Sequence, residues 1–210
     1  MPRVVVTGAE QAAGVSRWHI TESEGELLEA AAASVPEEIH HPVKRLEWLA
    51  GRALLMQQCR DLGIRWKGVV KDQHGKPFLV QSHAHLSVSN SFPWIACQLR
   101  HEGPAGIDIE QPRPSLLRVL PRMLSPTELS DAGDSQQKSC VYWCAKEALF
   151  KWHGERGIHF SRHIEIRPFT YDLHGGQLTA ALVTHQLRRS IELQYVPTTE
   201  WTLVYTLSEL

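Results

Sequence analysis

Residues 106–110 read Gly-Ile-Asp-Ile-Glu, and residues 143–151 read Trp-Cys-Ala-Lys-Glu-Ala-Leu-Phe-Lys. The first stretch alternates as a β-strand does, which places Asp108 and Glu110 on one face and the two isoleucines on the other, toward the core. Two neighbouring carboxylates repel each other unless a cation joins them. Oxygen ligands favour Mg²⁺ or Ca²⁺ over zinc. Taken alone, the pair also fits an acidic strand edge exposed to water.

The second stretch lies on a helix predicted over residues 139–153. One apolar stripe of this helix consists of Val141, Ala145, Ala148 and Trp152. Glu147 and Lys151 lie four residues apart, so the simplest interpretation of the two is a surface ion pair worth a few tenths of a kcal/mol.

Other local signals predict an α+β protein. A helix begins at Pro42, which suits a first helical position, and Gly63 ends it. A capping box of Thr21 and Glu24 predicts a helix through residues 26–33. Residues 85–91 alternate two apolar residues with three serines, as in a half-buried strand. The remaining strands are predicted at residues 1–7, 65–70, 94–99, 106–110, 164–168, 190–196 and 201–207.

A helix start is also predicted at residues 125–128, which read Ser-Pro-Thr-Glu, with Glu128 as the reaching-back member of a capping box. Each half of the chain therefore offers helices and several short strands. We expect two similar α+β lobes, residues 1–105 and residues 106–210, that pack against each other because no low-complexity linker separates them.

Composition excludes several classes of protein. The 210 residues include 22 basic and 23 acidic ones, so the basic excess typical of a general nucleic-acid binder is missing. No apolar run approaches a membrane span, and the first residues lack the apolar region of a secretion signal. The four cysteines form no Cys-x-x-Cys pair and fit reduced thiols in a cytoplasmic protein. The twelve histidines show no zinc-site spacing, so we interpret them as surface or core residues.

A second group of residues could bind a phosphate. Lys76 lies in a Gly-Lys-Pro turn that would hold its ammonium in place as a point charge. The serines of residues 85–91 could add hydroxyl donors. This Gly-Lys is no Walker loop, since the earlier glycine and the Ser or Thr after the lysine are missing. Turns often contain lysine and strands often contain serine, so each signal alone is weak.

Read in order, these stretches resemble the Sfp-like branch of the 4′-phosphopantetheinyl transferase superfamily. The matching motifs are residues 45–52, 75–77, 86–91, 106–110, 124–128 and 143–151. The resemblance implies a chain of two related α+β lobes, monomeric rather than assembled from several chains, with coenzyme A and a magnesium ion in the cleft between the lobes. The two acidic motifs are the most specific part of the match.

The resemblance also implies roles for single residues. Asp108, Glu110 and Glu147 would be the Mg²⁺ ligands, with Asp108 also next to coenzyme A. Lys151 would contact the phosphates or assist proton transfer, and Glu128 matches a position proposed as a base in some members. The contacts to coenzyme A would come from Lys76, Ser89 and Asn90, with Arg45 and Arg52 as nearby candidates.

One position departs from the family pattern. The family usually reads Ser-His-Ser where this chain reads Ser89-Asn90-Ser91. An asparagine can donate a hydrogen bond from its amide but can never become positively charged. We therefore expect binding of coenzyme A to be weaker, or less dependent on pH, than in relatives with the histidine.

The implied reaction moves the phosphopantetheine arm of coenzyme A onto a serine of an apo carrier protein and releases adenosine 3′,5′-bisphosphate. The carrier could belong to fatty-acid, polyketide or non-ribosomal-peptide synthesis, and the exposed Arg113, Arg118 and Arg122 could meet its acidic surface. The general base could be Glu128, Glu147 or a metal-bound water. Two alternatives stay open: a metal-dependent phosphodiesterase or nuclease, and a non-catalytic coenzyme A-binding relative. We expect no nucleic-acid or membrane partner.

Overall fold

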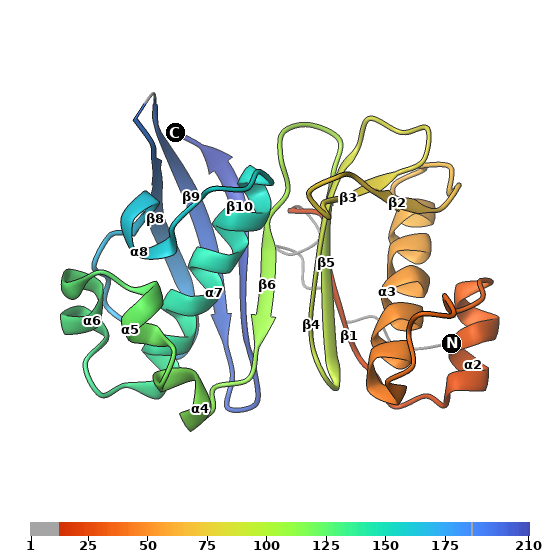
Figure 1. Ribbon diagram of the computed structural model, residues 1–210, viewed down its shortest axis with the longest axis horizontal. Coiled ribbons are helices and arrows are strands. Elements are labelled where there is room, and N and C mark those ends of the chain that lie inside the picture. Colours follow the sequence, from red (N-terminus) through yellow and green to blue (C-terminus); the bar gives the residue numbers. More distant parts are fainter. Residues whose placement is uncertain (1–12, 186) are drawn as a thin grey trace. The chain divides into compact units, whose positions relative to one another are not determined.

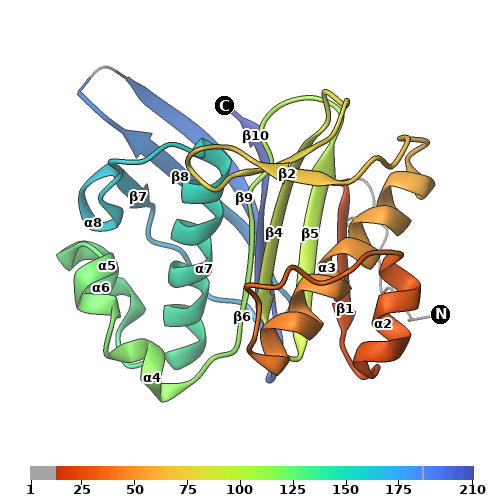
Figure 2. The same cartoon turned by 45° about the vertical axis from the view of Figure 1, so that its right-hand side comes forward.

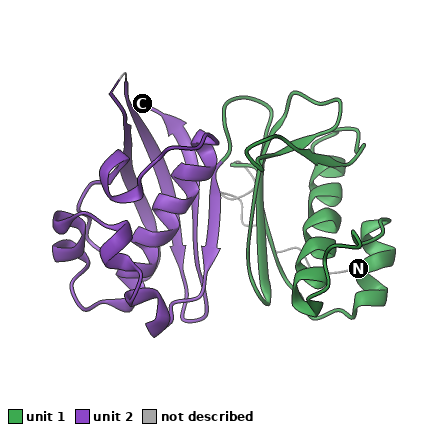
Figure 3. Ribbon diagram, viewed as in Figure 1, with its two compact units in different colours: residues 1–105 green, residues 106–210 purple. Residues whose placement is uncertain are grey.

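The computed structural model describes residues 13–185 and 187–210, and the strand predicted at residues 1–7 lies outside them. The chain has a mixed α+β fold, as predicted, and divides into two compact units, Met1–Ala105 and Gly106–Leu210 (Figure 3). No helix of the described residues is long and apolar enough to cross a membrane. All four cysteines are buried thiols.

Unit 1 is built on a three-stranded antiparallel sheet in the order β1-β5-β4. Its strands are β1 (Val15–His19), β4 (His85–Ser91) and β5 (Trp94–Arg100). Helix α3 (Pro42–Asp61) packs on this sheet, and α2 (Glu24–Ala31) packs on α3 (Figure 2). A separate hairpin is formed by β2 (Val69–Lys71) and β3 (Pro77–Leu79).

Several predictions for unit 1 are confirmed and others are corrected. Helix α3 begins at Pro42 as expected. The cap of α2 is Ser23 with Glu26, not Thr21 with Glu24: the Ser23 hydroxyl accepts the Glu26 N–H, and the Glu26 carboxylate accepts the Ser23 N–H. Strand β1 was not predicted. The three serines of β4 are buried, so the face predicted to meet water is covered, while Asn90 on the other face is exposed.

Unit 2 is built on a five-stranded antiparallel sheet in the order β6-β10-β9-β8-β7. Its strands are β6 (Ile107–Glu110), β7 (Ile164–Ile166), β8 (Gly176–Val183), β9 (Arg188–Pro197) and β10 (Thr202–Glu209). Its helices are α4 (Pro114–Leu117), α5 (Leu120–Met123), α6 (Pro126–Ala132), α7 (Gln136–His153) and α8 (Phe160–His163). Helix α7 runs across this sheet and contacts all five strands (Figure 1).

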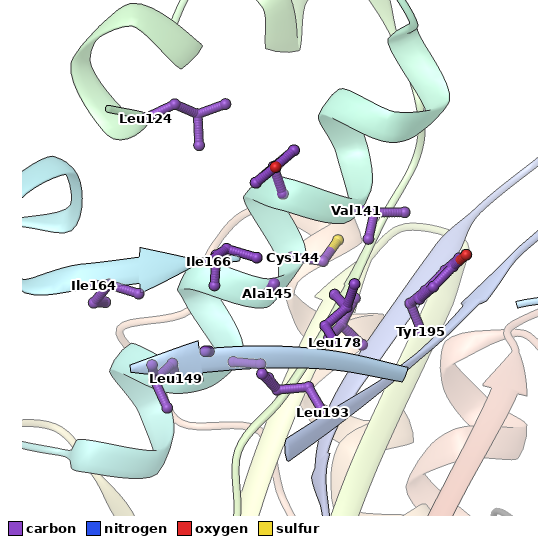
Figure 4. Packing of buried hydrophobic residues seen from close by; sticks show 14 of the residues in the cluster. Leu124, Val141, Cys144, Ala145, Leu149, Ile164, Ile166, Leu178, Leu193 and Tyr195 are labelled. Carbon is purple, nitrogen blue, oxygen red and sulfur yellow. The ribbon is translucent and has the colours of Figure 1, made fainter. Parts of the chain in front are cut away.

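Local signals explain most elements of unit 2. Ser125 caps α6 and forms the predicted capping box with Glu128. Helix α7 ends at Gly154, whose φ of 77° is a left-handed conformation that favours glycine. The apolar side of α7 belongs to the core of this unit, where Ile166 of β7 points toward Ala145 (Figure 4). Strand β8 lies between the strands predicted at residues 164–168 and 190–196 and was not predicted.

Candidate functional site

Strand β6 presents its two carboxylates from the edge of the sheet of unit 2. Asp108 lies opposite Val204 of β10 and is 5% exposed, so even the acidic face of this strand is largely covered. The residue before the strand must be glycine, because a Cβ on Gly106 would lie 2.2 Å from the carbonyl oxygen of Ala148 in α7. The close contact between β6 and α7 therefore depends on Gly106.

Helix α7 brings a cation to this strand. The Lys151 ammonium lies 2.7 Å from Asp108 Oδ1 and also donates to the carbonyl of Ile107 at 3.1 Å. The predicted surface ion pair with Glu147 is thus wrong: the ion pair of Lys151 is with Asp108 of β6. Its position joins the two sequence motifs in one site.

Glu147 belongs to the same group of charges. Burial, and after it the negative charge of Asp108, raises the pKa of Glu147 to about 7, with Glu110 adding to the rise and Lys151 opposing it. The three carboxylates and Lys151 therefore act on one another electrostatically. A half-buried acid with such neighbours is typical of a functional site, although structural charge networks produce the same effect.

The residues fit a hard divalent cation by their chemistry, since all three offer oxygen donors and repel one another. Lys151 already neutralises part of the charge on Asp108, and Arg113 donates to Glu110 Oε1 at 2.8 Å. Across residues 13–185 and 187–210, no three His, Cys, Asp or Glu side chains are grouped so that they could hold a metal ion. Binding of a cation by these three carboxylates would therefore require their side chains to move closer together.

Glu128 has a different environment. Its side chain is buried, and its two oxygens accept three hydrogen bonds: from Ser125 N at 2.6 Å, from Ile166 N at 2.8 Å and from the Lys146 ammonium at 2.8 Å. A carboxylate so fully engaged is poorly placed to take a proton from a substrate. The geometry favours a role in positioning.

The two predicted arginines of α3 are also engaged. Arg45 forms an ion pair with Glu24 of α2 at 2.6 Å and donates to the carbonyl of Ile39. Arg52 lies over the ring of Trp48, 3.5 Å from its centroid, and burial lowers its pKa. Both guanidinium groups contribute to the packing of unit 1, and their contacts with coenzyme A stay a prediction.

Lys76 lies in a tightly hydrogen-bonded turn. Asp72 Oδ1 accepts the backbone N–H of Lys76 at 2.9 Å, and Asp72 N–H donates to the Lys76 carbonyl. Lys76 also acts on His85 at the start of β4, whose pKa is lowered first by burial and then by the Lys76 charge. The turn therefore holds a cation close to β4.

Ser89 and Asn90 are neighbours on β4, an edge strand of its sheet. Successive strand residues point to opposite faces, and here Ser89 is buried while Asn90 is exposed. Of the two, Asn90 is the one that a ligand could reach without a rearrangement of the strand.

One residue of the site was missed by sequence reasoning. Lys146 is fully buried, and its ammonium donates to the carbonyls of Phe160 and Ile164 besides pairing with Glu128. A signal was available, since the helical period places Lys146 in line with the apolar Tyr142 and Leu149. Because lysine is so rarely buried, the sequence alone favours an exposed side chain at this position.

The sequence was compared with known proteins. Residues 104–205 match the 4′-phosphopantetheinyl transferase superfamily. The 4′-phosphopantetheinyl transferase Sfp of Bacillus subtilis is 34% identical over 89 residues, which cover 40% of this chain and 39% of the relative. The AcpT enzymes are matched at greater length: that of Salmonella typhimurium is 32% identical over 142 residues, or 64% of this chain and 70% of the relative.

The AcpT of Escherichia coli K12 is 30% identical over 142 residues, which cover 71% of it. The chain thus covers about two fifths of the length of the Bacillus relatives and most of the length of the AcpT relatives. The matched residues include β6 and α7, the two elements that meet at Asp108 and Lys151. This chain belongs to the 4′-phosphopantetheinyl transferase superfamily.

Proposed function

We propose that this protein transfers the 4′-phosphopantetheine arm of coenzyme A to a serine hydroxyl of an apo carrier protein. The observation that supports this most strongly is the meeting of α7 with β6, where Lys151 and Glu147 join Asp108. The names of the relatives agree with this reaction.

In this proposal the serine oxygen bonds to the phosphorus that bears the pantetheine arm. The phosphoanhydride bond breaks, adenosine 3′,5′-bisphosphate leaves with the bond electrons, and the serine hydroxyl loses a proton. Phosphoryl transfer needs mainly positioning and neutralisation of charge. Lys151, which is partly exposed, is placed to offset negative charge on the phosphates.

Asp108, Glu110 and Glu147 are the residues proposed to hold Mg²⁺. A bound Mg²⁺ would neutralise phosphate charge at this site. Glu147 or a water molecule is proposed to accept the serine proton, and Glu128 is the poorer candidate because its oxygens already accept three hydrogen bonds. Lys76 and Asn90 are proposed to contact coenzyme A from unit 1, with Ser89, Arg45 and Arg52 as further candidates.

The surface proposed for the carrier protein is the segment of α4 and α5. Arg118 and Arg122 are exposed there, beside Leu117 and Val119, whose exposed fractions are 38% and 36%. A mixed apolar and basic surface complements an acidic carrier. Arg113 differs from the other two arginines, since its guanidinium pairs with Glu110.

The test is to incubate the protein with coenzyme A, Mg²⁺ and purified apo acyl or peptidyl carrier proteins, and to measure the intact mass of each carrier. The expected result is a mass increase equal to one phosphopantetheine arm, lost when the carrier serine is changed to alanine. Cleavage of nucleic acids or phosphodiesters without carrier modification would instead favour a phosphodiesterase. No transfer to any of several carriers would favour a binding protein without catalysis.

A further inference from the structure

A buried ion pair links α7 to three other elements of unit 2. The Lys146 ammonium is 2.8 Å from Glu128 Oε2 in α6, 2.9 Å from the carbonyl of Phe160 in α8 and 2.6 Å from the carbonyl of Ile164 in β7. All three donors of this lysine therefore have an acceptor. Its side chain is fully buried, and that of Glu128 is 3% exposed.

Glu128 also forms hydrogen bonds to α6 and β7. Besides pairing with Lys146, it closes the capping box of α6 through Ser125 N and binds the N–H of Ile166 in β7. The two side chains together fix where α7 lies relative to α6, α8 and β7. The Lys146 nitrogen and both Glu128 carboxylate oxygens all take part in hydrogen bonds to neighbouring elements.

Lys146 directly precedes Glu147, and successive residues of an α-helix point about 100° apart. A helix held by Lys146 on one side cannot turn about its axis without moving Glu147 on the other. Lys151, which contacts Asp108, lies further along the same helix. The Lys146–Glu128 pair therefore bears on the positions of Glu147 and Lys151, although its charged groups bond to neither of them.

We propose that Glu128 and Lys146 are positioning residues, whose buried ion pair sets the rotation of α7 and thereby the approach of Glu147 and Lys151 to β6. This inference rests on the proposed function, because it assigns the pair to the metal and phosphate site of that reaction. It gives Glu128 a role in activity without making it the base.

A variant that tests positioning must not simply unfold the protein. Replacing both partners of a buried ion pair by neutral residues often leaves stability unchanged, whereas removing one partner leaves a buried charge without compensation. The informative variant is therefore the double substitution Lys146→Met with Glu128→Gln. The glutamine can still take part in the capping box.

Unit 2 offers a matched control between the same two helices. Lys138 of α7 lies 2.8 Å from Asp131 of α6, and Tyr142 also donates to this carboxylate at 2.6 Å. The control variant is Lys138→Met with Asp131→Asn, which removes an α6–α7 ion pair at the other end of α7 from Lys151.

The experiment measures Mn²⁺ binding to each free protein by electron paramagnetic resonance, and kcat and KM for coenzyme A. We expect the Lys146/Glu128 variant to remain folded by circular dichroism but to bind Mn²⁺ about tenfold more weakly and to lose about a hundredfold in kcat. KM for coenzyme A should change little. The Lys138/Asp131 variant should keep wild-type Mn²⁺ affinity and kcat.

A folded Lys146/Glu128 variant with wild-type Mn²⁺ affinity and kcat would overturn the proposal. Losses of Mn²⁺ affinity and kcat of the same size in the Lys138/Asp131 variant would also overturn it. If the double variant does not fold, Glu128→Asp tests the same point, because it keeps the charge and shortens the side chain by one methylene. Wild-type protein that binds Mn²⁺ but modifies no carrier would disprove the proposed function, and the Mn²⁺ comparison would still test the positioning role.

Discussion

The two long helices α3 and α7 each pack on an antiparallel sheet, yet they use their charged residues in different ways. In α3 the cations serve packing: Arg45 pairs with Glu24, and Arg52 stacks on Trp48. In α7 the Lys151 ammonium instead reaches the acidic strand β6, where it pairs with Asp108. Under the proposed function, a similar helix-on-sheet frame supports packing in one unit and carries the metal and phosphate site in the other.

Each of the two helices also has a glutamate shielded from water, Glu47 fully and Glu147 in part. Glu47 of α3 has Lys44 at 2.6 Å on the same helix. Glu147 of α7 has a pKa raised to about 7, because burial and two neighbouring carboxylates outweigh the effect of Lys151. A glutamate held next to like charges is costly to the fold, and such an environment is typical of a functional site, whereas the paired Glu47 has none of it.

Replacing each glutamate by glutamine tests this difference most strongly. Glu147→Gln should lower kcat/KM by roughly 10²–10³-fold, because one charged group of the site is lost. The same change should leave the metal-free protein equally stable or more stable, since it removes a charge that Asp108 and Glu110 repel. Carrier modification by mass spectrometry and thermal unfolding without metal are the two measurements.

Glu47→Gln is the control and should show the opposite pattern. It should cost about 1 kcal/mol of stability through the lost charged hydrogen bond to Lys44, with turnover unchanged. Similar losses of turnover in the two variants would mean that α3 and α7 do not differ in the way described here.

The next largest effect is expected at glycines where a helix meets a strand. Gly106→Ala should destabilise unit 2 by about 1–3 kcal/mol and displace β6 from α7, because the new Cβ would meet backbone at 2.2 Å. Activity should fall in parallel, since Asp108 moves with the strand. Chemical denaturation and the carrier assay measure the two effects.

Gly51→Ala in α3 is the matched change in unit 1. Its Cβ would meet only side-chain ends, Ile95 Cδ1 at 3.1 Å and Val88 Cγ1 at 3.9 Å, which can shift, so the loss of stability should be smaller and activity should persist. Equal losses of stability and activity in the two variants would show that β6 and α7 are not unusually close.

A smaller effect is expected for the arginines of α4 and α5. Arg118→Glu with Arg122→Glu should raise KM for an acidic carrier by about tenfold without lowering kcat, and added salt should reduce the difference. The control is Arg60→Glu, an exposed arginine at the end of α3. An unchanged KM would place the carrier elsewhere.

The smallest effect is expected at Asn90 of unit 1. Asn90→His should strengthen coenzyme A binding a few-fold as the pH falls from 8 to 6, because histidine gains its charge near pH 6.5. In wild-type protein Asn90 adds no such change, so the affinity of the variant should depend more strongly on pH than that of the wild type. Titration calorimetry at pH 6, 7 and 8 decides the matter, and a variant whose affinity does not change with pH would contradict the prediction.

Sequence alone determined the elements whose signals are local. The strand of Asp108 and Glu110 follows from period-two alternation, α3 from Pro42 and its apolar period, and α6 from its capping box. The order of the motifs also identified the family. These features depend on residues a few positions apart, so no knowledge of the tertiary contacts was needed.

Only the tertiary structure decided what depends on residues distant in the chain. Pairing with β5 and β9 makes strands of β1 and β8, which the sequence did not predict. Lys151 is placed against Asp108, and Lys146 is buried against Glu128. The sequence shows each of these residues as an ordinary charge, because the burial and the partner that define its role come from other segments of the chain.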